Sequence, residues 1–222
     1  MDQRKQEIAA GYDAITEKIG LDTAFYARCI NMLSHCQGAV LDIGCGRGLL
    51  LKELREKFPD ATYTGLDISE RLCAISRENN PHATIVCGDA ESLPFTSDLF
   101  DVVFMTEALE HMLDHNQAVS ELARVLKRGG VCVVTVPNRD WVSYDFYDKI
   151  RNKSLQPVDD HYFRAQEVTA LLASNGLRVK RIRGSDNLFY YGWKHSLEQL
   201  AAVFLPFLHK KMKRLIILCE KQ

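Results

Sequence analysis

A glycine-rich turn links an apolar run to a helical pattern at residues 42–48, which read Asp-Ile-Gly-Cys-Gly-Arg-Gly. The run before it, Ala39 to Ile43, has the length and apolar content of a buried strand. Glycines lack the Cβ that would hold a ligand away from the backbone, and they tolerate a tight turn into a helix. In an open parallel sheet, ligands bind beyond the carboxyl ends of the strands. Residues 42–48 are therefore a candidate ligand-binding turn, although such a pattern alone is also typical of an ordinary strand-to-helix connection.

Two further acids follow the next two predicted strands. Asp67 closes the second strand and Asp89 follows the third. A carboxylate in the position of Asp67 can accept both hydroxyls of a ribose. Asp89 can accept a hydrogen bond from an adenine amino group while Ile68 and Ala90 border the ring. One such acid is more often a solvated residue, but acids at the ends of three successive strands favour a binding site.

Ionisable residues also cluster after the fourth predicted strand. Thr106 directly follows that strand and is a further candidate contact of the ligand. If residues 106–112 are helical, Glu107, Glu110 and His111 stand at i, i+3 and i+4 and project from one face. Among these side chains, His111 is the best suited to accept a proton, because of its intrinsic pKa. A solvated helix turn, or a buried histidine with satisfied hydrogen bonds, explains the same residues.

Short apolar strands alternate with amphipathic helices along most of the chain. This alternation argues for an α/β fold in which a parallel sheet is covered by helices on both faces. Gly129 and Gly130 are expected to end one of these helices. The predicted strands are 39–43, 62–66, 84–87, 101–105, 131–136, 177–183 and 215–219, and the predicted helices are 6–19, 23–33, 49–58, 70–78, 106–112, 116–127 and 165–175.

Bulk properties limit the class of protein. With 222 residues, of which 46% are apolar and 26% charged, the chain is long enough for one large core and short for two. The formal charge of −1 lacks the basic excess of nucleic-acid-binding proteins. Seven scattered cysteines without a Cys-x-x-Cys pair are typical of reduced thiols in a cytoplasmic protein. No apolar run is long enough to cross a bilayer, so at most peripheral membrane contact is expected.

The chain resembles the class I S-adenosylmethionine-dependent methyltransferases from about Ala39 through Asn138. The resemblance implies a doubly wound, Rossmann-like, mostly parallel sheet of seven strands in the order 3-2-1-4-5-7-6, with the last strand antiparallel. The matching residues are the strand and turn at 40–48, Gly65-Leu66-Asp67, Gly88-Asp89-Ala90 with Leu93-Pro94-Phe95, and the runs at 100–103 and 126–130.

The resemblance also implies a cofactor, S-adenosylmethionine, and a role for each acid. Asp42 and the turn would position the methionine end, Asp67 the ribose and Asp89 the adenine. The full set of implied cofactor contacts is Asp42, Gly44, Cys45, Gly46, Asp67, Ile68, Asp89, Ala90 and Thr106.

A nicotinamide dehydrogenase is the main rival among enzymes that share this kind of sheet. A dinucleotide fingerprint requires Gly-x-Gly-x-x-Gly, so that a pyrophosphate lies on a helix N-terminus. Here the third glycine, Gly48, comes one residue early, and Asp42 would repel a pyrophosphate. A sulfonium cofactor with an ammonium group tolerates that acid.

A more specific resemblance concerns a metal. Glu-x-x-Glu-His at 107–111, followed at a distance by His161, looks like the ubiquinone-biosynthesis O-methyltransferases and the small-RNA 2′-O-methyltransferases. In those enzymes two Glu and two His gather a divalent ion. The resemblance implies a site for Mg²⁺, Mn²⁺ or Zn²⁺ made by Glu107, Glu110, His111 and His161. Such an ion would lower the pKa of a substrate hydroxyl and orient its oxygen. Residues 139–160 do not otherwise match these enzymes.

Two aromatic-rich segments, 139–163 and 188–208, are predicted to select the acceptor. Both are too apolar to stay in water without a partner surface. For 188–208, a lid over an apolar acceptor or an interfacial membrane helix competes with a helix packed on the domain. The predicted organisation is one domain over 1–222, with N-terminal helices in 1–36, a cofactor-binding core in 37–138 and these two acceptor-side segments.

The predicted reaction is methylation of an oxygen on a small phenolic or lipid-like acceptor. Methyl transfer is an in-line displacement, so the protein must align nucleophile, methyl group and sulfur and remove one proton. His111 is the candidate for that proton transfer. N- or C-methylation on the same fold, and a non-catalytic cofactor-binding module, remain open alternatives. The oligomeric state is not predicted.

Overall fold

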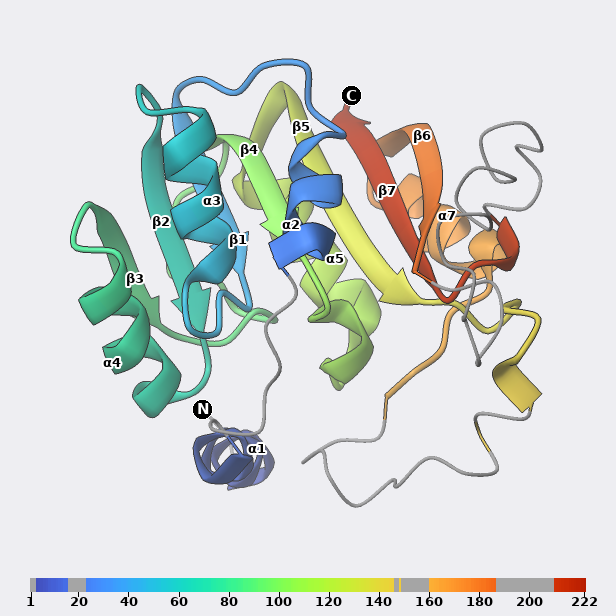
Figure 1. Ribbon diagram of the computed structural model, residues 1–222, viewed down its shortest axis with the longest axis horizontal. Helices are drawn as coiled ribbons and strands as arrows, with labels where there is room; N and C mark the ends of the chain where they lie inside the picture. The colour runs from blue at the N-terminus through green and yellow to red at the C-terminus, as the bar shows by residue number, and fades with distance from the viewer. Residues whose placement is uncertain (1–2, 16–22, 146–147, 149–159, 187–209) are drawn as a thin grey trace.

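The computed structural model describes residues 3–15, 23–145, 148, 160–186 and 210–222 (Figure 1). The predicted insert 188–208 therefore lies outside the described residues, as does most of 146–159. No helix among the described residues is long and apolar enough to span a bilayer.

A seven-stranded sheet with the order β3-β2-β1-β4-β5-β7-β6 forms the centre of the fold (Figure 1). The first five strands pair in parallel, whereas β7 is antiparallel to both β5 and β6. The predicted strand order and the antiparallel last strand are confirmed. The strands are β1 (Ala39–Ile43), β2 (Thr62–Asp67), β3 (Ala83–Cys87), β4 (Phe100–Met105), β5 (Leu126–Pro137), β6 (Leu177–Ser185) and β7 (Arg214–Lys221).

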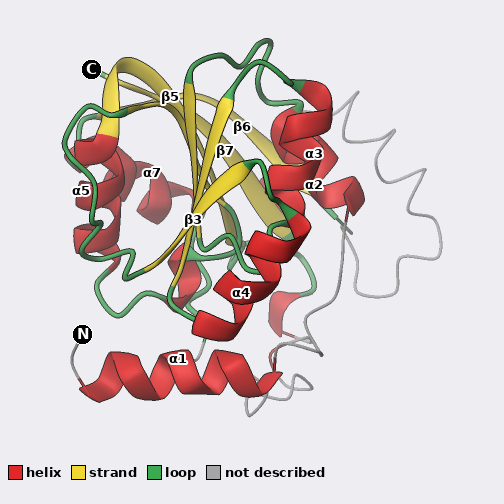
Figure 2. Ribbon diagram, turned by 90° about the vertical axis from the view of Figure 1, so that its left-hand side faces the viewer, coloured by secondary structure: helices red, strands yellow, loops and turns green. Residues whose placement is uncertain are grey.

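Helices cover both faces of the sheet, as Figure 2 shows with the sheet seen nearly edge-on. On one face lie α2 (Thr23–Ile30), α3 (Leu49–Lys57) and α4 (Glu70–Asn79), and on the other lie α5 (His115–Val125) and α7 (Ala165–Ser174). Helix α1 (Gln3–Ile15) belongs to neither layer, because it crosses the end of the sheet at which β1, β2 and β4 finish.

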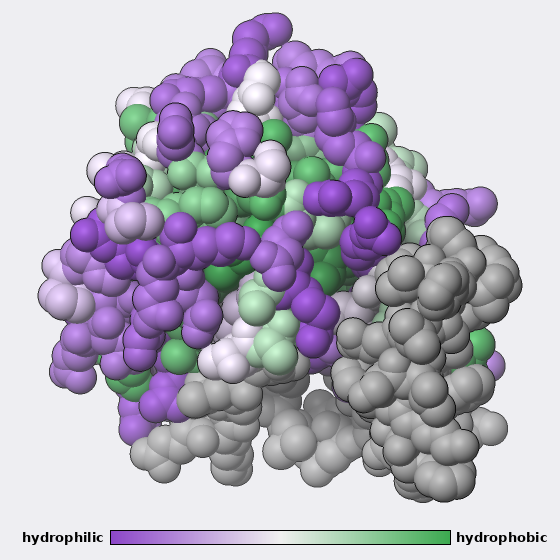
Figure 3. Space-filling view, turned by 45° about the horizontal axis from the view of Figure 1, so that its top comes forward, coloured by the Kyte–Doolittle hydropathy of each residue, from purple (hydrophilic) through white to green (hydrophobic). Residues whose placement is uncertain are grey.

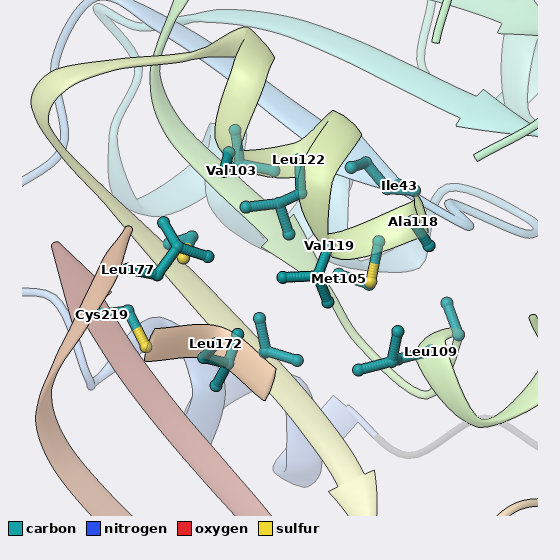
Figure 4. Packing of buried hydrophobic residues seen from close by; sticks show 14 of the residues in the cluster. Ile43, Val103, Met105, Leu109, Ala118, Val119, Leu122, Leu172, Leu177 and Cys219 are labelled. Carbon is teal, nitrogen blue, oxygen red and sulfur yellow. The ribbon is translucent and has the colours of Figure 1, made fainter. Parts of the chain in front are cut away.

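The sheet separates two apolar clusters. Successive strand side chains point to opposite faces, so Val40 packs in the cluster under α2 and α3 while Leu41 packs in the cluster under α5 and α7. Burial on both faces explains why β1 is almost wholly apolar. In the second cluster, Val119 and Leu122 of α5 pack against the sheet near Met105 (Figure 4).

Two expectations about helices are wrong. Residues 106–112 do not form one helix, since only a short 3-10 helix, η2 (Leu109–His111), is present and Glu107 has a left-handed φ of 51°. The helix predicted over 116–127 ends at Val125 instead of at Gly129 and Gly130, which lie inside β5. The physical reason is tertiary: Leu126 is already extended and pairs with Phe100 of β4, which draws the chain into the sheet.

Leu122→Ala is expected to lower the free energy of unfolding by about 2–5 kcal/mol, because it leaves a cavity in a closed core. The Leu122 side chain is fully buried. Urea denaturation followed by circular dichroism would measure the change. Leu99→Ala is a matched control, since Leu99 is 40% exposed and its truncation should cost far less. Equal losses for both variants would contradict this account of the core.

Candidate functional site

A cavity of about 640 Å³ lies beyond the carboxyl ends of β1, β2 and β4. Its walls come from the glycine turn, from the residues after β2 and β3, and from the segment after β4, while Lys5, Ile8 and Tyr12 of α1 close it from outside. The opposite end of the sheet is turned toward the viewer in Figure 3, where mostly hydrophilic residues surround a smaller apolar area. The cavity therefore sits at the end of the sheet that the sequence predicts.

The glycine turn is attached to the end of β2 through its backbone. Strand pairing sets Ile43 opposite Leu66, and the N–H groups of Gly44 and Cys45 both donate to the Leu66 carbonyl at 2.7 and 2.9 Å. Gly44 has a φ of 75°, and a Cβ there would lie 2.7 Å from the Cβ of Ala108. Gly46 has a φ of 51°. Only glycine fits both positions without strain. The backbone of the turn therefore lies directly at the cavity wall.

Asp67 connects the turn to the end of β2. Its Oδ2 accepts a hydrogen bond from the Gly46 N–H at 2.8 Å, and its Oδ1 accepts one from the Ser69 N–H at 2.9 Å. Burial raises the pKa of Asp67, while these backbone N–H groups oppose the rise by stabilising the charged form. The carboxylate is thus held in one orientation at the cavity wall, and each oxygen keeps a lone pair that a ribose hydroxyl can use.

Asp89 forms an ion pair with Lys5 of α1. Lys5 Nζ donates to Asp89 Oδ2 at 2.5 Å and to Glu91 Oε2 at 2.8 Å, and the Glu91 N–H donates to Asp89 Oδ1 at 2.9 Å. Ile68 and Ala90 also line the cavity, on either side of the expected adenine position. Adenine recognition by Asp89 stays a prediction, and Lys5 is the partner that the sequence did not reveal.

Asp42 lies behind the turn and not in the cavity wall. It is 1% exposed, and its Oδ1 has no hydrogen-bond partner among the described residues. Burial raises the pKa of Asp42 well above its usual range, and the nearby charge of Asp67 adds to the rise. Direct contact between Asp42 and the methionine end stays a prediction.

Glu107 is held by an ion pair. Its N–H donates to Thr135 Oγ1 at 2.9 Å, that hydroxyl donates back to Glu107 Oε1 at 3.0 Å, and Arg214 Nε donates to Glu107 Oε2 at 2.6 Å. Arg214 also pairs with Asp186. The left-handed backbone of Glu107 is strained for a residue with a side chain, and these bonds hold it there.

Three ionisable side chains meet beside Glu107 in the cavity wall. His111 Nδ1 lies 3.3 Å from Asp160 Oδ1, and Glu110 is 4% exposed. Burial lowers the pKa of His111, although the charges of Asp160 and Glu107 act in the opposite direction. Burial, followed by the charge of Glu107, raises the pKa of Glu110 well above its usual range. This group therefore favours a neutral imidazole and a neutral carboxylic acid.

The four predicted metal ligands are neighbours but are not arranged around one ion. The His161 N–H donates to the Glu110 carbonyl at 3.1 Å, so the two segments touch. The His161 imidazole, however, pairs with Glu167 at 2.7 Å and lies outside the cavity wall, while Arg214 holds Glu107. In the part of the chain that the structure describes, no three His, Cys, Asp or Glu side chains could hold a metal ion. These side chains do not fit the implied ion as they stand, and the site stays a prediction.

Comparisons with known proteins agree with this geometry. The family model described as a methyltransferase domain matches residues 41–134. A probable S-adenosylmethionine-dependent methyltransferase of Mycolicibacterium smegmatis is 34% identical over 68% of this chain, and the match spans 57% of that protein. The ubiquinone biosynthesis O-methyltransferase of Coxiella burnetii (strain RSA 331) is 29% identical over 76% of this chain and 74% of its own length.

A solved structure agrees on the fold. The S-adenosylmethionine-dependent methyltransferase from Mesorhizobium loti superposes with a TM-score of 0.67 at 18% identity, over 90% of this chain and 98% of that one. The chain belongs to the class I S-adenosylmethionine-dependent methyltransferases. Its cofactor is S-adenosylmethionine.

In this methyltransferase, most of the predicted cofactor contacts line one cavity. They are Gly44, Cys45, Gly46, Asp67, Ile68, Asp89, Ala90 and Thr106, joined by Glu107, Glu110 and His111.

Several residues of the methyltransferase cavity could not be found from the sequence. Nothing in the sequence indicates that the Tyr12 ring contacts the His111 ring edge to face, with the ring centroids 5.9 Å apart. Tyr26, Asp160 and Arg214 carry no motif at all, although all three line the cavity. Arg214 is partly buried and lies between two carboxylates, those of Glu107 and Asp186.

Asp67→Ala in the methyltransferase is expected to weaken S-adenosylmethionine binding at least tenfold. The variant loses hydrogen bonds to a charged acceptor, which contribute about 1.5–3 kcal/mol each. Titration calorimetry measures the affinity. Asp60→Ala removes an exposed carboxylate just before the other end of β2 and should bind the cofactor normally. Unchanged affinity in a folded Asp67→Ala protein would remove the ribose assignment.

Proposed function

We propose that the protein transfers the methyl group of S-adenosylmethionine to a hydroxyl oxygen of a small, phenolic or lipid-like acceptor, with His111 as the proton acceptor. The observation that carries this proposal is the partly buried contact between His111 and Asp160 in the cavity that the cofactor-binding turn opens into. The cofactor supplies an electrophilic methyl group on a sulfonium. What the protein must add is alignment of the acceptor oxygen and removal of its proton.

The position of Asp160 favours one form of the imidazole. Asp160 Oδ1 lies 3.3 Å from Nδ1 without hydrogen-bond geometry, so it acts through its charge, which favours the tautomer with the proton on Nδ1 and leaves Nε2 of His111 as the basic nitrogen. Burial keeps the pKa of His111 low, so the ring is neutral and able to accept a proton near neutral pH. Once it has accepted one, the charge of Asp160 stabilises the resulting imidazolium.

The rest of the acceptor end suits a largely apolar molecule. Ile8, Phe25, Met112 and Leu113 line the cavity together with the aromatic ring of Tyr162. Apolar walls with a few convergent polar groups are typical of small-molecule sites. The Coxiella burnetii protein, whose name states O-methylation in ubiquinone biosynthesis, supports an oxygen acceptor of this class.

His111→Gln is expected to lower kcat by at least 100-fold while S-adenosylmethionine affinity changes less than threefold. Removing a general base costs about 10²–10⁴ in rate. Formation of S-adenosylhomocysteine with a panel of phenols and catechols measures turnover, and the product identifies the methylated atom. His35→Gln, at an exposed site, is the matched control. Full turnover in His111→Gln would contradict the assignment, and N- or C-methylated products would correct the acceptor class.

The pH profile provides an independent prediction. Only the neutral imidazole accepts a proton, so kcat should rise with pH through a pKa below the usual histidine value and then level off. Because Asp160 raises the pKa of His111, Asp160→Asn should move this acid limb to lower pH and lower the plateau. An acid limb that does not move would argue that Asp160 and His111 are not coupled.

Turnover is expected to persist in excess EDTA, because the proposed proton transfer uses side chains alone. The measurement is initial rate before and after chelation, with Mg²⁺ or Mn²⁺ added back. Loss of activity that these ions restore would instead support the four-residue metal site and would require Glu107 to leave Arg214 and His161 to leave Glu167.

A further inference from the structure

Two cysteine thiols meet directly behind the wall that holds the cofactor. Cys73 comes from α4, and Cys87 is the last residue of β3. The Cys73 thiol donates to the carbonyl of Asp67 at 3.5 Å, and the Cys87 thiol donates to the carbonyl of Ile68 at 3.7 Å. Cys73 Sγ also lies 3.6 Å from the carbonyl of Val86, the residue before Cys87, so the two thiols are neighbours. Both are therefore attached to the two residues that line the ribose and adenine end of the cavity.

The two thiols differ in access. Cys87 is exposed, whereas Cys73 is fully buried. The remaining five cysteines, all within the described residues, are buried as well. Cys87 is thus the thiol that a dissolved reagent can reach, and Cys73 is the neighbour positioned to react with it next.

We propose that Cys73 and Cys87 form a reversible disulfide that weakens S-adenosylmethionine binding. The oxidant is a low-molecular-weight disulfide such as oxidised glutathione. The Cys87 thiolate attacks it, forming a mixed disulfide and releasing one glutathione thiol. The Cys73 thiolate then attacks the Cys87 sulfur and releases the second thiol. Two cysteine thiols are oxidised to one disulfide, one glutathione disulfide is reduced to two thiols, and the protons leave with the glutathione.

The bond changes the wall of the cofactor site for a geometric reason. A disulfide requires the sulfurs to approach to about 2.05 Å, well inside thiol hydrogen-bond distance. Neither sulfur can then donate to the carbonyls of Asp67 and Ile68. The Asp67 carbonyl also accepts the Gly88 N–H at 2.8 Å, so movement there is passed to a second cavity residue. By linkage, bound cofactor must disfavour the disulfide by the same factor.

The reaction should be slow at neutral pH and faster in base. Burial raises the pKa of both thiols, that of Cys73 to about 12. Since the thiolate is the attacking form, its fraction grows as the pH rises toward these values. A pair of this kind responds to sustained oxidation and not to a brief pulse.

The experiment treats the full chain with oxidised glutathione at pH 8.5, followed by removal of the reagent. Mass spectrometry should show the loss of two hydrogens, and trypsin should release residues 72–77 linked to residues 78–124, each of which contains a single cysteine. Calorimetry should show S-adenosylmethionine affinity falling at least tenfold and returning after dithiothreitol. Saturating S-adenosylmethionine during oxidation should slow formation of the linked peptide.

Cys87→Ser is expected to bind the cofactor normally when reduced and to keep that affinity after oxidation. Cys36→Ser, a buried cysteine away from the cavity wall, is the matched control and should respond like the parent protein. A stable glutathione adduct on Cys87 without the linked peptide would overturn the proposal, and so would a linked peptide with unchanged affinity. The readout is cofactor binding, so the result is independent of the acceptor and of the role of His111.

Discussion

The cofactor site depends on one backbone attachment, between the glycine turn after β1 and the end of β2. Leu66 accepts hydrogen bonds from two successive N–H groups of the turn, and Asp67 accepts one from Gly46. Because neighbouring parallel strands end at the same edge, this attachment places the turn and the Asp67 carboxylate side by side. The cavity wall formed by the turn and the orientation of Asp67 follow from it, and the pairing of β4 with β1 brings the segment after β4 to the same edge.

The same edge of the sheet collects many carboxylates, and their charge must be balanced in a partly buried space. Two cations from opposite ends of the chain contribute to this. Lys5 of α1 pairs with Asp89 and Glu91, and Arg214 of β7 pairs with Glu107 and Asp186. Buried charges are tolerated when they are paired and hydrogen-bonded. Helix α1 and strand β7 therefore take part in the site as well as in the fold.

The charge balance is different in the part of the cavity around His111. There Glu110 is buried and His111 and Asp160 are partly buried, and the cation that the described residues bring near them is Arg214, which Glu107 already binds. Burial then acts on protonation, favouring the neutral imidazole and the neutral Glu110 carboxyl. One cavity thus joins a charged, hydrogen-bonded wall around Asp67 and Asp89 to a wall around His111 and Glu110 where burial favours the neutral forms.

Local patterns in the chain predicted the alternating strands and helices, and the resemblance carried by the motifs predicted the strand order and the cofactor, while the individual cofactor contacts stay predictions. Strand periodicity and the spacing of the glycine turn, Asp67 and Asp89 are properties of short segments, and they do not change with distant contacts. The tertiary structure alone decided the helix ends near 106–127, since pairing of Leu126 with Phe100 overrides the glycines. It also decided the partners: Lys5 and Asp89 are 84 residues apart, and Arg214 and Glu107 are 107 apart. Periodicity carries no information on which distant side chains meet, because ion pairing and burial depend on the folded chain.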